Sequence, residues 1–240
     1  MIKLLLLLLK AGKLGKVLLT GGTMIISVIA YSWLFGWPYA VGFVALIFVH
    51  EMGHYIAARR RGLDVGAPTF IPFVGAWVQL KDMPHDAETE AYVGVAGPIA
   101  GTLGALACFY LARNYDSQLL LALAYAGFFL NLFNLIPISP FDGGRVTAVI
   151  SPKLWLIGIP ILAALFFYRP SPLLILMAFL AAPQAWKAWQ ALRGKLPPEE
   201  QAYYLASSET RFNYGALYIG LVGFLALMCH DLHEELPRAF

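Results

Sequence analysis

Long apolar runs separated by short polar or proline-containing breaks dominate the pattern of this chain. A membrane-spanning helix needs about 20 mostly apolar residues, and several stretches come close to that length. The candidate spans are residues 17–35, 37–58, 91–112, 119–136, 154–168, 173–189 and 214–229. The run 154–168 is short and Pro160 interrupts it, so six and seven spans both fit. The pattern predicts an all-α polytopic membrane protein.

The segment between the second and third spans has a different pattern. Residues 67–80 mix β-branched and aromatic residues with Pro68, Pro72 and Gly75, which disfavour a helix. We expect a small β-hairpin-like segment there, with a plain loop that caps a water cavity as the alternative. Its apolar character predicts that it dips toward the bilayer, where non-helical backbone must be buried or line a cavity.

Composition agrees with a membrane protein. The chain is 60% hydrophobic and 13% charged, and a soluble domain would need more charge to cover its surface. A net charge of +3 without a basic patch gives no reason to invoke nucleic acid. The opening MIKLLLLLLKAGKLGK resembles a signal peptide but lacks a small-residue cleavage site, so we expect an interfacial lead-in to the first span.

The basic residues predict an orientation. If the N-terminus is cytoplasmic and seven spans alternate, every Lys and Arg except Arg113, Arg169 and Arg238 falls on the cytoplasmic side. We therefore expect a multi-pass protein of the plasma (inner) membrane with its N-terminus toward the cytoplasm. No soluble domain is left over, and residues 1–240 read as one membrane-embedded domain. Oligomeric state has no signature in the sequence.

Three ionisable residues interrupt the second span. His50 and His54 are four residues apart, so on a helix both imidazoles project from one face and can share a metal ion. Glu51 lies beside them, where it could hold a water molecule and take its proton. Polar packing between helices is the alternative, but ionisable groups are costly within an apolar span.

A catalytic zinc site needs a third protein ligand. Asp142 follows Pro137 and Pro140, which break the fourth span, and precedes the flexible pair Gly143 and Gly144. This broken end suits an inward-facing oxygen ligand. In the seven-span topology it arrives at the same face as His54, so the two halves of the site would meet.

The third span contains GPIAGTLGA, in which Gly97, Gly101 and Gly104 form a flat face. We expect this face to serve close packing between helices.

His-Glu-x-x-His within a span, followed by Asn-x-x-Pro-x-x-Pro-x-Asp-Gly at 134–143, resembles the site-2 protease family of intramembrane zinc metalloproteases. EAYVGVAGPIAG at 90–101 also resembles the family's segment between these motifs. The resemblance implies one zinc ion bound by His50, His54 and Asp142, with Glu51 as the catalytic base. It also implies that Asn134 binds the substrate backbone or stabilises the oxyanion. PDZ and CBS modules of some members are absent from this sequence, so we expect a minimal form.

The expected function is hydrolysis of a peptide bond in or near a transmembrane segment of another membrane protein, releasing a cytoplasmic or membrane-tethered fragment. The catalytic core would cover about 36–150, with additional helices at 151–230. One alternative is a non-proteolytic metal-binding scaffold or client-binding protein, although a structural metal site needs no base. A metal transporter is another, but it would place ionisable residues along several spans rather than at one level.

Overall fold

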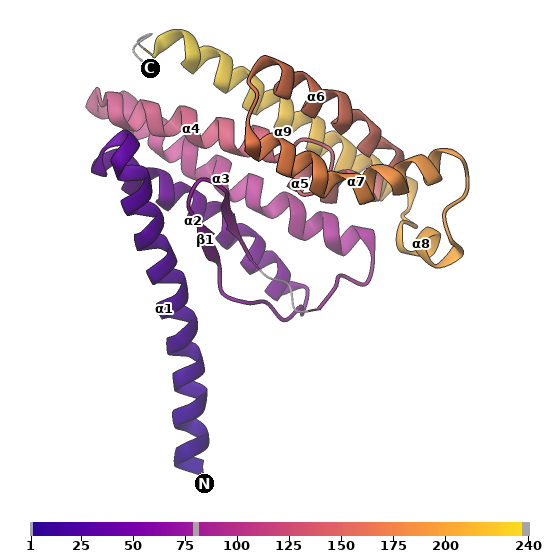
Figure 1. The fold of residues 1–240 in the computed structure, drawn as a ribbon, viewed down its shortest axis with the longest axis horizontal. Helices are drawn as coiled ribbons and strands as arrows, with labels where there is room; N and C mark the ends of the chain where they lie inside the picture. The colour runs from indigo at the N-terminus through magenta and orange to yellow at the C-terminus, as the bar shows by residue number, and fades with distance from the viewer. Residues whose placement is uncertain (1, 79–81, 237–240) are drawn as a thin grey trace.

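The structure, a computed structural model, describes residues 2–78 and 82–236, and this part of the chain is mostly helical (Figure 1). The elements in chain order are α1 (Ile2–Phe35), α2 (Trp37–Arg60), β1 (Thr69–Ile71), β2 (Gly75–Trp77), α3 (Ala87–Tyr115), α4 (Gln118–Asn134), α5 (Asp142–Ile150), the 3-10 helix η1 (Pro152–Ile157), α6 (Gly158–Tyr168), α7 (Pro172–Leu192), α8 (Pro198–Tyr203) and α9 (Ser208–Glu235).

Helix α3 is the centre of the bundle and packs against α2, α4, α5 and α9. Helices α2, α3, α4 and α9 lie alongside one another, whereas the N-terminal half of α1 points away from them (Figure 1). Helices α6 and α7 pack together with η1 at the end of the bundle where α8 lies (Figure 1). This arrangement places α5 between the central helices and the α6–α7 pair.

The predicted spans fall in helices, except that residues 135 and 136 of the fourth span lie beyond the end of α4. Within the described residues, four helical segments are long and apolar enough to cross a membrane: Leu18–Phe35, Trp37–Arg60, Ala87–Tyr115 and Ser208–Glu235. Two shorter apolar helical segments, Gln118–Asn134 and Pro152–Tyr168, accompany them. The chain is therefore an integral membrane protein by fold, and the count of six to seven spans stays a prediction.

Two helices differ from the expected pattern. The short run 154–168 is divided between the 3-10 helix η1 and α6, and Pro160 lies in the first turn of α6, where a missing N–H leaves no helical bond unmade. Helix α6 has 11 residues, which gives a length of about 16 Å, half the hydrocarbon thickness. Helix α1 is continuous from Ile2 to Phe35, so the expected lead-in and the first span are one helix.

The predicted hairpin is present. Strands β1 and β2 pair antiparallel, with Phe70 opposite Ala76. Residues 79 and 80 of the predicted segment lie outside the described residues. The hairpin rests on α1, because Phe70 N–H donates to Thr23 Oγ1 at 3.3 Å and Phe73 N–H donates to the Tyr31 hydroxyl at 3.1 Å.

The contact between Phe70 and Thr23 decides which strand edge is free. Opposite residues in an antiparallel pair either exchange both backbone hydrogen bonds or point all their polar groups outward. Phe70 N–H points toward α1 and not toward β2, so Ala76 directs its own N–H and C=O away from β1. The outer edge of β1 is covered by α1, and the outer edge of β2 is the one that offers backbone groups.

Candidate metal centre

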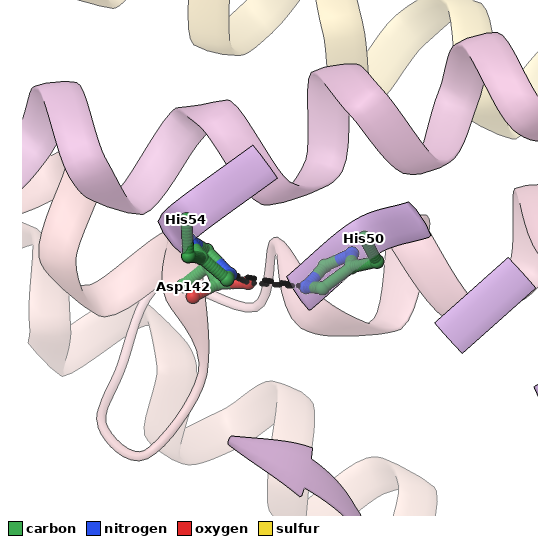
Figure 2. Close-up of side chains that lie close together, drawn as sticks. All are labelled: His50, His54 and Asp142. Atoms are coloured by element: carbon green, nitrogen blue, oxygen red, sulfur yellow. Dashed lines mark hydrogen bonds and ion pairs between the residues drawn. The ribbon is translucent and has the colours of Figure 1, made fainter. Parts of the chain in front are cut away.

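Three potential metal ligands from two helices meet inside the bundle (Figure 2). His50 and His54 lie one turn apart on α2, and Asp142 is the first residue of α5. His50 Nε2 lies 3.1 Å from Asp142 Oδ2, His54 Nε2 lies 3.2 Å from the same oxygen, and the two Nε2 atoms are 3.1 Å apart. All three residues are buried.

The other nitrogen of each imidazole is occupied by an acceptor. His50 Nδ1 lies 2.8 Å from Asn131 Oδ1, and the Asn131 amide nitrogen donates to the Gly127 carbonyl at 2.7 Å, which orients the amide. His54 Nδ1 lies 2.8 Å from the Val93 carbonyl oxygen. Both Nδ1 atoms must therefore carry the proton, and the neutral rings turn bare Nε2 lone pairs toward each other.

This donor set fits a metal ion. Two imidazole lone pairs and a carboxylate oxygen are all acceptors, and they repel one another unless a positive charge lies between them. In a tetrahedral site with metal–ligand distances of about 2.0–2.1 Å, neighbouring ligand atoms are about 3.3 Å apart. The observed separations of 3.1, 3.1 and 3.2 Å are close to that value. His50, His54 and Asp142 together could hold one metal ion.

Asp142 is held in place by its own helix. Sequence reasoning expected flexibility at Gly143 and Gly144, but both are buried residues of α5 packed against the preceding loop, so that expectation is wrong. A Cβ at Gly144 would lie 2.5 Å from the Ile138 carbonyl carbon, so only glycine permits this approach. Arg145 Nη1 lies 3.8 Å from Asp142 Oδ1, which leaves Oδ2 for the imidazoles.

Side chains from later in the chain anchor α5. Trp155 Nε1 donates to the Gly144 carbonyl at 2.8 Å, and the Trp155 ring is buried. At the other end of α5, Arg211 Nη1 donates to the Ile150 carbonyl at 2.7 Å. Arg211 Nη2 also donates to the Tyr204 carbonyl at 3.1 Å, so one guanidinium joins α5 to the start of α9. These bonds fix the third ligand relative to the bundle.

The glycine face of α3 makes room for the site. A Cβ at Gly97 would overlap the His54 imidazole, and a Cβ at Gly101 would overlap the Asn131 amide. Gly104 instead packs against Leu46 and Val49 of α2, at 3.3 and 3.4 Å from a built Cβ. Close helix packing, the expected role, therefore applies to Gly104, whereas Gly97 and Gly101 accommodate the side chains of the metal centre.

The other two predicted site residues, Glu51 and Asn134, lie outside the group of three potential metal ligands. Glu51 follows His50 on α2 and is 6% exposed, with no hydrogen-bond partner within the described part of the chain. Asn134 is half-buried at the C-terminal end of α4, and no contact within the described residues joins it to the three ligands. Sequence reasoning missed Asn131, although an amide in the middle of an apolar helix is a signal that it has a partner.

Three buried potential metal ligands inside an apolar helical bundle are typical of a metal-binding membrane protein. The family model Peptidase family M50 matches residues 38–119, which include His50 and His54 but not Asp142. Zinc metalloprotease MJ0392 of Methanocaldococcus jannaschii is 28% identical over 123 residues, covering 48% of this chain and 35% of that protein. The candidate zinc metalloprotease Rip3 of Mycobacterium tuberculosis is 34% identical over 122 residues, covering 48% and 31%.

Among solved structures, the site-2 protease from M. jannaschii aligns over 77% of this chain and 88% of its own, with a TM-score of 0.46 and 20% identity. Over residues 38–119 the chain is thus similar to peptidase family M50, and over about half its length it is similar to named zinc metalloproteases. The chain spans about a third of the length of the first two relatives.

Proposed function

We propose that this protein is an intramembrane zinc endopeptidase that hydrolyses a peptide bond in or near a transmembrane segment of another membrane protein. The observation that carries the proposal is the convergence of two bare Nε2 atoms and one carboxylate oxygen at 3.1–3.2 Å inside an apolar bundle. His50, His54 and Asp142 hold the zinc ion. Similarity to peptidase family M50 and to a named zinc metalloprotease supports the reaction type.

Zinc bound there supplies a Lewis acid and makes hydrolysis by water feasible near neutral pH. Glu51 performs the proton transfers. Its carboxylate accepts a proton from the attacking water and then donates it to the leaving amine nitrogen. The absence of a hydrogen-bond partner for Glu51 within the described residues supports this role, because nothing in the described chain competes with water for the carboxylate.

The reaction takes place within the membrane, nearer the cytoplasmic face. His54 and His50 precede Arg59 by five and nine residues, or about 7 and 14 Å of helix. Arg59, Arg60 and Arg61 mark the cytoplasmic end of α2 by the preference of basic residues for that side. The N-terminus then lies in the cytoplasm, and six or seven spans cross the plasma (inner) membrane.

A helical substrate must unwind before its peptide bond can be cut, because helical hydrogen bonds bury the backbone groups. The free edge of β2 offers the outward N–H and C=O of Ala76 as pairing partners for an unwound strand. Substrates with Gly or Pro near the scissile bond unwind most easily. Asn134 then contacts the substrate backbone or stabilises the oxyanion from the end of α4.

The test is co-expression with a panel of tagged single-span substrates. The wild-type protein cuts at least one substrate, Glu51→Gln cuts none, and Glu51→Gln retains one zinc ion per chain. Glu209→Gln, the same change at an exposed site on α9, serves as the matched control and cuts normally. Equal cutting by wild type and Glu51→Gln would remove Glu51 from the mechanism. A client that co-purifies with the wild-type protein and is never cut would favour a binding protein instead.

A further inference from the structure

A cavity of about 560 Å³ lies beside the loop that precedes Asp142. Its wall includes Ser139, which precedes Asp142 by three residues, and Glu90 in the first turn of α3. Gln184 of α7 also lines it and accepts a hydrogen bond from Ser139 N–H. Three residues span at most about 10 Å, so the part of the cavity beside Ser139 lies within about that distance of Asp142.

Negative charge dominates the lining. Glu90, Glu199 and Glu200 face the cavity, and Lys187 is the only basic residue among the lining residues that the structure describes. Lys187 Nζ lies 3.1 Å from Glu200 Oε1. Glu200 Oε2 is buried and has no hydrogen-bond partner within the described residues, and Glu199 is exposed. After the ion pair between Lys187 and Glu200 has formed, Glu200 Oε2 and the Glu199 carboxylate can therefore still accept hydrogen bonds.

Aromatic rings complete the wall. Tyr203 donates its hydroxyl to Glu90 Oε2 at 2.7 Å, and Tyr204 packs edge-on against Trp155 with ring centroids 5.7 Å apart. Burial and the neighbouring carboxylates of Glu90 and Glu200 raise the pKa of the Tyr204 hydroxyl to about 12. The cavity thus disfavours further negative charge. Carboxylates combined with aromatic faces suit a cationic side chain.

We propose that this cavity binds a Lys or Arg side chain in the cytoplasmic flank of the substrate, about three to five residues from the scissile bond. This inference rests on the proposed peptidase function and specifies its substrate class. Cytoplasmic flanks of membrane proteins are enriched in Lys and Arg, so the charge of the cavity complements the segment that a substrate brings to this end of the bundle. A volume of 560 Å³ accommodates a long side chain with water.

The experiment uses the full-length protein in vesicles of phosphatidylglycerol, a lipid without an amine headgroup. A single-span membrane protein from the co-expression panel carries Lys, Gln or Glu at each flank position in turn. Cutting rates are compared for wild type, Glu199→Lys and Glu209→Lys. Co-purification of each uncut substrate with Glu51→Gln, with and without Glu199→Lys, measures binding separately from chemistry.

The wild-type protein is expected to cut the Lys substrate about five- to ten-fold faster than the Glu substrate at the responsive position. Glu199→Lys reverses this preference, and Glu209→Lys, the matched change outside the cavity, leaves it unchanged. Because Glu199 is exposed and has no ion-pair partner within the described chain, we expect its substitution to leave the fold intact, which the thermal unfolding of the variant checks.

The outcomes separate the two proposals. Cutting that ignores flank charge in all proteins overturns the cavity assignment and leaves the peptidase intact. Charge-dependent co-purification without cutting supports the cavity assignment and overturns the peptidase. A third outcome is that flank charge has no effect, while added phosphatidylethanolamine speeds the cutting of every substrate only when Glu199 is intact. In that case a lipid amine occupies the cavity, and the assignment is overturned.

Discussion

Asn131→Ala tests how much the metal centre depends on the amide that holds His50. The substitution removes the 2.8 Å bond between His50 Nδ1–H and the Asn131 amide oxygen, so the ring loses both its fixed tautomer and its orientation. The Gly127 carbonyl keeps its helical partner, the backbone N–H of residue 131, so no buried acceptor is orphaned.

The magnitude follows from the role of outer partners of metal-bound histidines, whose removal costs about 10–100-fold in metal affinity. That factor corresponds to about 1.4–2.7 kcal/mol, slightly more than the net value of one ordinary hydrogen bond. The loss of zinc-binding free energy should exceed the value of one hydrogen bond, because the freed His50 ring can rotate its Nε2 away from Asp142. The loss should appear in zinc affinity, with a small effect on thermal stability.

The assay is competition for zinc between the purified protein in detergent and a chromophoric chelator. Asn134→Ala is the matched control, because it makes the same change three residues later on the same helix, at a half-buried position away from the ligands. It should keep wild-type zinc affinity and lower only the cutting rate. A folded Asn131→Ala protein with unchanged zinc affinity would refute the inferred tautomer and the inferred lone-pair geometry together.

Three further outcomes follow from the geometry. Gly97→Ala should weaken zinc binding at least ten-fold, since its Cβ overlaps the His54 imidazole, whereas Gly104→Ala should change chelator competition little. Asp142→Ala should abolish the zinc-dependent rise in unfolding temperature, so a rise equal to that of the wild type would exclude Asp142 as a ligand. Ala76→Pro removes the outward N–H of β2 and should slow substrate cutting several-fold without altering zinc content. Unchanged cutting would argue against pairing at this edge.

Helix positions and the shared helix face of His50 and His54 could be predicted from the sequence, because apolar run length and i, i+4 spacing are local properties. Their assignment as metal ligands together with Asp142 stays a prediction. The hairpin was predictable for a similar reason, since Pro68, Pro72 and Gly75 exclude a helix. The part that escaped prediction depends on distant contacts.

The roles of Gly97 and Gly101 are an example. A glycine face on α3 reads as helix packing until the positions of His54 and Asn131 are known. The rigidity of α5 is another, because Gly143 and Gly144 read as flexible in isolation. Their fixed conformation depends on a loop that approaches too closely for any side chain.

The attachment of α5 has a consequence for biosynthesis. His50 and His54 are synthesised long before Asp142, and the guanidinium that secures the end of α5 comes from Arg211, later still. During translation the early helices therefore carry two imidazoles without the carboxylate that completes the metal-binding group. Asp142 supplies that carboxylate once α5 has been made, and the hydrogen bond that secures the C-terminal end of α5 forms only after the start of α9 has been synthesised.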